Sequence, residues 1–98
     1  MQINLPNRVI RDIRTFAEDN AVKKVVLFGS RARGDNQPKS DIDIAVYGCN
    51  DFAGFTDQLN EELWSLLQLD IINMDDDNIS ERLLEEIERD GVELYAEV

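Results

Sequence analysis

Asp41 and Asp43 are the two residues of this sequence whose type and spacing most clearly suit chemistry. They alternate with apolar residues across positions 41–46, the period of two that is typical of a β-strand. On a strand, residues two apart project from the same face, about 7 Å from each other. Two carboxylates this close repel each other unless a proton or a cation neutralises them, and oxygen ligands favour Mg²⁺ or Mn²⁺. The pair therefore predicts a divalent-cation site.

An Asp-x-Asp pair is a weak indication by itself. The chain has twelve aspartates in 98 residues, so roughly one such pair arises by chance, and a second pair occurs at Asp75 and Asp77. The alternative for Asp41 and Asp43 is an ordinary strand face that is exposed to solvent. The surrounding residues must decide between these two interpretations.

A glycine-serine turn precedes the aspartates. Gly29 and Ser30 follow a run of β-branched and aromatic residues, and ten residues separate Ser30 from Asp41. A glycine at a strand end allows backbone N–H groups to approach a phosphate, and the next hydroxyl can donate to the same oxygens. Arg31 and Arg33 add positive charge at this position. The pattern predicts a phosphate-binding turn, and the alternative is a flexible turn with solvated arginines.

A third carboxylate, Asp70, lies within the apolar segment Leu69–Ile72. An ionised side chain in an apolar strand costs free energy unless it is paired or bound to a metal. Asp70 is therefore a candidate metal ligand. The alternative is the exposed face of an amphipathic strand.

Periodic patterns predict the elements that carry these residues. The predicted helices cover residues 6–20, residues 55–67, and a segment that starts at a capping box of Asn78 and Glu81 and ends at Asp90-Gly91. The predicted strands cover residues 25–28, a segment from Asp41 that ends at Gly48, residues 69–72 and residues 92–98, the last as an edge strand. Residues 29–40 form a polar loop with room for one helical turn, Asp75–Asp77 mark a turn, and Glu85, Glu86 and Glu88 form a solvated helix face.

These elements predict one domain over residues 1–98. Its fold class is α/β or α+β, with a mixed sheet of about four strands that is backed by helices. A domain of this size leaves much of its surface exposed, so a deep binding pocket would need a second chain to complete it.

Composition excludes several classes of function. The sequence has no histidine and a single cysteine, Cys49, which excludes an internal disulfide, a Cys-His zinc site and catalysis by imidazole. The apolar runs are too short to span a membrane, and no signal segment precedes them. We therefore expect a cytoplasmic protein without membrane contact.

Charge divides the chain into two unequal parts. Residues 1–40 hold eight basic and four acidic side chains, whereas residues 41–98 hold two basic and seventeen acidic ones, which sums to the net charge of −11. So acidic a chain is not expected to bind nucleic acid over a broad surface. A basic protein partner is more natural, although an acidic surface can also serve solubility alone.

The two motifs together resemble the signature of a known family. They are residues 27–35 (Leu-Phe-Gly-Ser-Arg-Ala-Arg-Gly-Asp) and residues 40–46 (Ser-Asp-Ile-Asp-Ile-Ala-Val). These segments closely resemble the signature of the minimal nucleotidyltransferases in the DNA polymerase beta superfamily. Asp70 matches, by order and context, the third acidic residue of that family, and Gly91–Tyr95 resembles its last strand.

The resemblance implies a polymerase beta-like nucleotidyltransferase fold and a role for each candidate residue. Two Mg²⁺ ions, or Mn²⁺, would bind Asp41 and Asp43, and Asp70 would complete the site of the ion that activates the acceptor hydroxyl. Asp70 could also receive the hydroxyl proton. The residues implied to bind the nucleoside triphosphate, ATP in the first instance, are Gly29, Ser30, Arg31 and Arg33.

The resemblance also implies a partner. The minimal family often acts as the antitoxin of an all-helical ribonuclease toxin of the HEPN class, and it transfers AMP to a toxin tyrosine. The acidic C-terminal part of this chain suits docking on a basic protein of that kind. Two alternatives remain open, namely a non-catalytic acidic module that masks its partner and an enzyme that modifies a small molecule such as an aminoglycoside.

Overall fold

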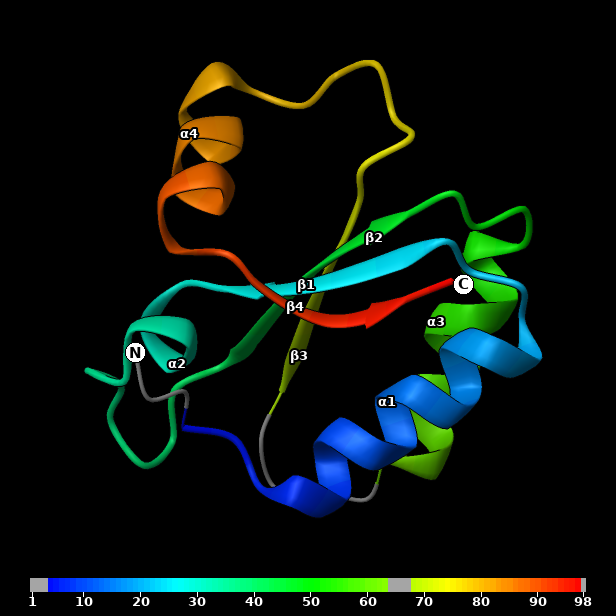
Figure 1. Cartoon of the computed structure of the whole chain (residues 1–98), viewed down its shortest axis with the longest axis horizontal. Coiled ribbons are helices and arrows are strands. Elements are labelled where there is room, and N and C mark those ends of the chain that lie inside the picture. The colour runs from blue at the N-terminus through cyan, green and yellow to red at the C-terminus, as the bar shows by residue number, and fades with distance from the viewer. Residues whose placement is uncertain (1–3, 64–67, 98) are drawn as a thin grey trace.

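The structure is a computed structural model that describes residues 4–63 and 68–97. In chain order, the elements are α1 (Asn7–Asp19), β1 (Lys24–Phe28), α2 (Ser30–Arg33), β2 (Ile42–Tyr47), α3 (Phe52–Glu62), β3 (Leu69–Asn73), α4 (Glu81–Asp90) and β4 (Val92–Ala96). The strands form one sheet in the order β3-β2-β1-β4, in which β1 is antiparallel to β2 and β4, and β2 is parallel to β3. The predicted mixed four-stranded sheet backed by helices is confirmed (Figure 1).

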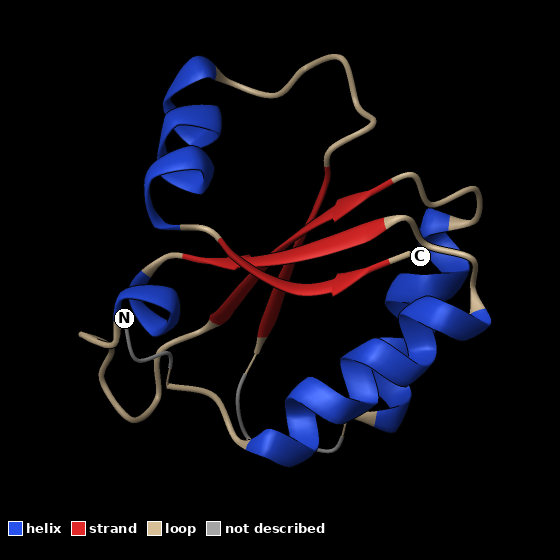
Figure 2. Ribbon diagram, in the orientation of Figure 1, coloured by secondary structure: helices blue, strands red, loops and turns tan. Residues whose placement is uncertain are grey.

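Helices cover the two faces of the sheet unequally. Helices α1 and α3 pack on one face, where they bury a large apolar core that includes Ile13, Leu27 and Phe55 (Figure 2). Helix α4 packs on the opposite face over a smaller core that includes Val26 and Ile87. Val26 and Leu27 serve different cores because successive side chains of a strand point to opposite faces. The α4 face therefore has room for polar residues beside its small core.

The beginning of α4 differs from the prediction. Ser80 is the N-cap, and its hydroxyl accepts a hydrogen bond of 3.2 Å from the backbone N–H of Leu83. The backbone N–H of Asn78 donates instead to Asp76 within the acidic turn. The predicted capping box of Asn78 and Glu81 was therefore wrong, because serine caps a helix as well as asparagine does and Glu81 is the first helical residue.

The remaining boundaries agree closely with the prediction. The polar loop contains its one helical turn, α2, and β4 is an edge strand. Helix α3 starts earlier than predicted, because the carboxylate of Asp51 caps it by accepting from the backbone N–H of Gly54 at 3.1 Å. Leu66 and Leu67, which were predicted to extend that helix, and Val98 lie outside the described residues.

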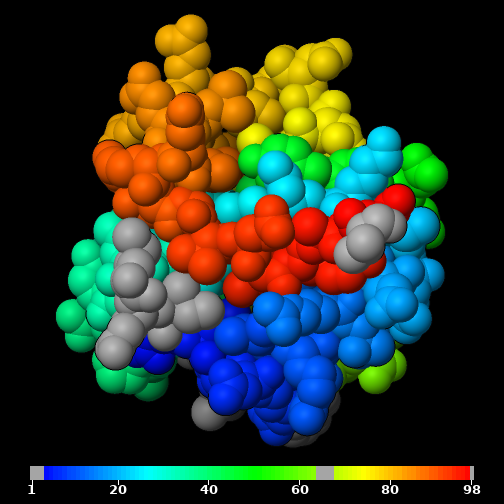
Figure 3. Space-filling view, viewed as in Figure 1, coloured from blue at the N-terminus to red at the C-terminus, as the bar shows by residue number. Residues whose placement is uncertain are grey.

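The space-filling view separates the two helical layers. Helix α4 and the acidic turn before it form one side of the molecule, α1 forms the opposite side, and β4 crosses between them (Figure 3). Within residues 4–63 and 68–97, no helix is both long enough and apolar enough to cross a membrane.

Candidate active site

Asp43 and Asp70 lie opposite each other on the parallel strands β2 and β3. Both belong to the α4 face of the sheet, because Asp43 alternates with Ala45, which packs against α4 in the small core. The negative charge of Asp70 acts on the Asp43 carboxyl group. Asp41 is exposed one residue before β2, and its charge acts on Asp43. The structure therefore pairs Asp43 with Asp70 and places Asp41 near enough for its charge to act on Asp43.

The electrostatics of this cluster are unfavourable to three ionised carboxylates. Partial burial raises the pKa of Asp43 to about 6, and the negative charges of Asp70, Asp41 and Glu86 act in the same direction. A bound divalent cation would relieve this repulsion, and the donors are all oxygens, as Mg²⁺ and Mn²⁺ prefer. In the described part of the chain, no three acidic, histidine or cysteine side chains are already set at metal-binding geometry.

The Gly29-Ser30 turn lies directly against the carboxylates. Phe28, the last residue of β1, is paired with Asp43 on β2, so the turn that follows passes over the Asp43 side chain. Gly29 has φ +76° and ψ −158°, a region that is essentially restricted to glycine. A Cβ atom at this position would collide with the Asp43 carboxylate. Both the backbone angle and the close approach require glycine here.

Arg31 is buried, in contrast to the free cation that the sequence analysis expected. Only 4% of the residue is exposed, and its guanidinium donates to three backbone carbonyls. These are the carbonyls of Ser40 at 3.1 Å, Asn4 at 3.0 Å and Pro38 at 3.2 Å. Arg31 thus ties the turn after Gly29 to the loop that leads into Asp41.

Arg33 lies at the surface and is held by two carboxylates. It donates to Asp35 at 3.0 Å and to Asp90, at the end of α4, at 2.9 Å. Asp90 is buried and also accepts from Arg89 at 3.0 and 3.2 Å. Hydrogen bonds from Arg89 and then Arg33 lower the pKa of Asp90. This network fastens α2 to the end of α4.

Sequence reasoning missed the contribution of α4 to the site. Glu86 was interpreted as part of a solvated face, yet it is half-buried and its charge acts on Asp43. The sequence does indicate that these side chains lie together. Glu85, Glu86 and Arg89 follow Arg82 by three, four and seven residues, so all four lie on one face of the helix. The end of the helix at Asp90 was predicted correctly, but the direction of this stripe depends on tertiary packing.

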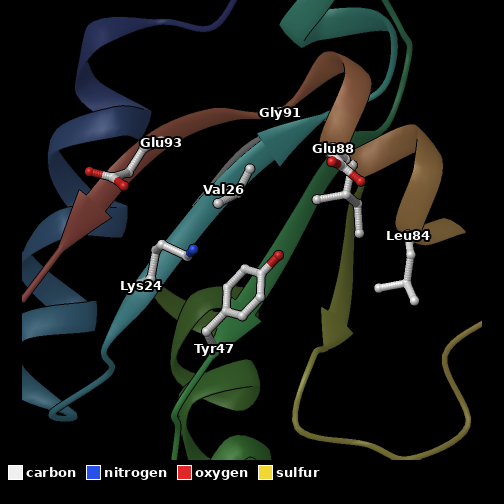
Figure 4. Close-up of a pocket in the computed structure, with 8 residues that line it drawn as sticks. Lys24, Val26, Tyr47, Leu84, Glu88, Gly91 and Glu93 are labelled. Carbon is white, nitrogen blue, oxygen red and sulfur yellow. The ribbon is translucent and has the colours of Figure 1, made fainter.

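A hollow of about 520 Å³ lies on the same sheet face, between α4, the start of β1 and the end of β2. Val26 and Ile87 are among its lining residues. Lys24 and Tyr47 line it as well, and the Lys24 ammonium lies 4.3 Å from the centre of the Tyr47 ring (Figure 4). None of the predicted site residues lines it. The carboxylate cluster and this hollow are therefore separate features of one face.

Comparison with known proteins places the fold and the motifs in a family. The family model described as Polymerase beta, Nucleotidyltransferase matches residues 11–97. A protein of Methanocaldococcus jannaschii that is provisionally named a protein adenylyltransferase is 58% identical over 31 residues, which cover 32% of this chain and 31% of that protein. The chain thus matches about a third of the length of this curated relative.

Solved structures share the fold. A toxin–antitoxin structure with AMP-PNP superposes with a TM-score of 0.69 at 24% identity, over 90% of this chain and 73% of that chain. A mutant of the toxin–antitoxin MntA-HpeT superposes with a TM-score of 0.68 at 22% identity, again over 90% of this chain and 73% of that chain. Because the family model covers most of the chain and the fold agrees, this protein is a nucleotidyltransferase of the polymerase beta family.

Proposed function

We propose that this protein transfers AMP from ATP to a hydroxyl group of a partner protein, and that the acceptor is a tyrosine of an HEPN-type toxin. The observation that carries the proposal is the meeting of Asp41, Asp43 and Asp70 beside the Gly29 turn, in a chain of a nucleotidyltransferase family. The names of the relatives support the finer points, since one is a protein adenylyltransferase and others are toxin–antitoxin structures, one with AMP-PNP.

The carboxylates would hold two Mg²⁺ ions, with Mn²⁺ as a substitute. Asp41 and Asp43 would contact both ions, and Asp70 would complete the site on the side of the acceptor. When bound, the ions supply charge stabilisation at the phosphates and lower the pKa of the acceptor hydroxyl. Burial raises the pKa of Asp43, and so does the repulsion from the neighbouring carboxylates, which a bound cation would relieve.

The proposed reaction is an in-line displacement at the α-phosphorus. The acceptor oxygen forms a bond to the α-phosphorus while the bond to the oxygen bridging the α- and β-phosphates breaks, and pyrophosphate leaves. Asp70 is exposed at the sheet edge and would accept the proton of the attacking hydroxyl. Gly29 and Ser30 would hold the β- and γ-phosphates through backbone N–H groups and the serine hydroxyl.

The two arginines of the motif would have different roles. Arg33 is at the surface beside the turn and keeps unused N–H donors for a phosphate, because a guanidinium has five and the two carboxylates take two. Arg31 donates to three buried carbonyls, so we assign it the support of the turn and of the Asp41 loop. This assignment replaces the direct nucleotide contact that was expected of Arg31.

The acidic C-terminal part would dock on the basic partner. Residues 41–98 carry a net charge of −15, from two basic and seventeen acidic side chains. Complementary charge would speed the encounter and orient the partner, and its contribution should weaken at high salt. The proposal places the reaction in the cytoplasm, where ATP and Mg²⁺ are available.

Label transfer from α-labelled ATP tests this function. The wild-type chain, Mg²⁺ and the protein that co-purifies with it are incubated together, and the acceptor residue is mapped by mass spectrometry. The proposal expects label on a tyrosine of the partner and none with Asp43→Asn. A stable complex that stays unlabelled with all four nucleotides, and in which Asp43→Asn still neutralises the partner, would instead establish a masking module.

A further inference from the structure

The acidic C-terminal part of the chain contains two basic side chains, Arg82 and Arg89, and both line the same hollow. Arg33, from α2, lines it as well, together with Glu85 and Glu86. The hollow has a volume of about 480 Å³ and its lining is formed by charged side chains. Two helices that are distant in the sequence therefore direct three guanidinium groups to one place, within a surface that is otherwise strongly acidic.

This arginine hollow adjoins the carboxylate cluster. Arg33 belongs to the same helical turn as Ser30, so the hollow begins where the proposed phosphate-binding turn ends. On its other side, Glu86 is near enough to Asp43 for its charge to act on that carboxyl group. A ligand whose β- and γ-phosphates are held by Gly29 and Ser30 could therefore also present these phosphates to the three arginines.

Asp90 sets the position of two of the arginines before any ligand binds. One of its carboxylate oxygens accepts from Arg33 at 2.9 Å and from Arg89 at 3.0 Å, and the side chain is 7% exposed. After these bonds and the bond of Arg33 to Asp35, three of the five N–H donors of each guanidinium remain. Arginine with free donors in a fixed orientation is well suited to bind phosphate oxygens.

We infer that Arg82 and Arg89 of α4 join Arg33 to form the subsite for the β- and γ-phosphates of the nucleotide, and for the pyrophosphate that is released. This inference rests on the proposed function for the identity of the ligand, an inorganic or nucleoside polyphosphate. It assigns to α4 a role in substrate binding in addition to its packing on the sheet. The subsite distinguishes a triphosphate from a monophosphate, since AMP has no group that reaches it.

Binding measurements on pyrophosphate, ATP and AMP test the subsite without requiring turnover. Titration calorimetry with Mg²⁺ compares the wild type with Arg82→Gln, Arg89→Gln and the double variant. The matched control is Arg8→Gln, which changes an exposed arginine on α1. We expect each single variant to weaken pyrophosphate and ATP about tenfold, the double variant to weaken them further, and AMP to change less than about twofold.

Three results would overturn the inference. The first is a wild type that binds no pyrophosphate, and the second is a double variant that binds pyrophosphate as tightly as the wild type. The third is an equal loss of affinity for AMP, which would indicate a general effect of charge or folding. Failure of the proposed function has a different signature, because pyrophosphate binding that depends on Arg82 would persist in a chain that transfers no nucleotide to any acceptor.

Discussion

Asp43 and Asp70 are direct partners across the parallel strands β2 and β3, and the charge of Asp70 acts on the Asp43 carboxyl group. The two residues are 27 positions apart in the sequence, and the crossover through α3 brings them together. Gly29, at the end of β1, lies against the same Asp43 carboxylate. A small sheet thus gathers groups from three strands at one point, which is where we propose that metal-assisted phosphoryl transfer takes place.

Removing the charge of Asp43 should stabilise the protein in the absence of metal. The pKa of Asp43 is about 6 in the folded protein, above its ordinary value of 3.8, so folding favours the protonated form and stability falls as the pH rises between these values. Asp43→Asn should be more stable than the wild type at pH 8 by about 1 kcal/mol, an amount reduced by solvent screening of this half-buried group. The two proteins should be nearly equal at pH 4.

Urea denaturation at the two pH values measures this difference. Mg²⁺ should reverse it at pH 8, because the ion stabilises the wild type and has fewer ligands in the variant. A variant that is less stable than the wild type at pH 8 without metal would contradict the repulsion between these carboxylates.

Substituting Gly29 should damage the site more than the addition of one methyl group suggests. Gly29→Ala requires a non-glycine residue to adopt φ +76°, and the new Cβ would collide with the Asp43 carboxylate. We expect a loss of stability of about 1–3 kcal/mol and a fall in transfer activity of at least about tenfold. Gly34→Ala is the control for backbone strain, because Gly34 also has a positive φ, of 85°, and caps the end of α2. Equal activity losses in the two variants would contradict a specific contact with Asp43.

Arg31 and Arg33 should differ in what they contribute. Arg31→Met leaves three carbonyl groups without their donor in a buried setting, so it should destabilise the fold by about 3 kcal/mol. Arg31→Lys keeps the charge but lacks the planar fork, and it should recover only part of this loss. Arg33→Gln, at a more exposed position, should cost less than about 1 kcal/mol. Urea unfolding of the three variants checks the order, and an Arg33 effect larger than that of Arg31 would contradict it.

The Asp90 network should make stability depend on pH in the acid range. Bonds from Arg89 and Arg33 lower the pKa of Asp90, so its ionised form stabilises the fold at neutral pH and this contribution disappears as the pH falls through the folded-state pKa. Asp90→Asn should therefore have a lower melting temperature than the wild type at pH 7, and the difference in melting temperature should shrink below about pH 4. Thermal melts between pH 3 and pH 7 provide the measurement. A constant difference over this range would mean that the charge of Asp90 is not what matters.

Local patterns in the sequence predicted most of the fold, because the strands alternate and the helices have apolar stripes at their normal spacing. Residues 41–46 were recognisable as a strand because Ile42, Ile44 and Val46 point into the large core, whereas the aspartates between them point to the opposite face. The start of α4 was placed incorrectly because Asn78 and Ser80 are both good caps, and local preference does not separate them.

The arginines show what the sequence could not provide. Arg31 and Arg33 are two residues apart in one polar loop and looked equivalent, yet one is buried and the other is at the surface. The burial of Arg31 depends on carbonyls of Asn4 and Pro38, which only the folded chain brings near. The approach of Arg33 to Asp90 likewise joins positions 57 residues apart. Long-range contacts of this kind leave no periodic signal.

Nucleotide transfer by aspartate variants tests the central claim most directly. The claim is that Asp41, Asp43 and Asp70 act together as the metal-binding centre of the transferase. Initial rates of transfer from α-labelled ATP to the co-purified partner are measured over a range of Mg²⁺ and Mn²⁺ concentrations. The variants are Asp41→Asn, Asp43→Asn and Asp70→Asn, with Asp77→Asn, from the exposed acidic turn, as the matched control.

We predict that each of the three site variants loses at least about a hundredfold in rate at saturating metal, while Asp77→Asn keeps the wild-type rate. Circular dichroism spectra of all four proteins should match that of the wild type. Near-normal transfer by Asp43→Asn or by Asp70→Asn, in a folded protein and with metal present, would contradict the assignment of this carboxylate cluster as the active site.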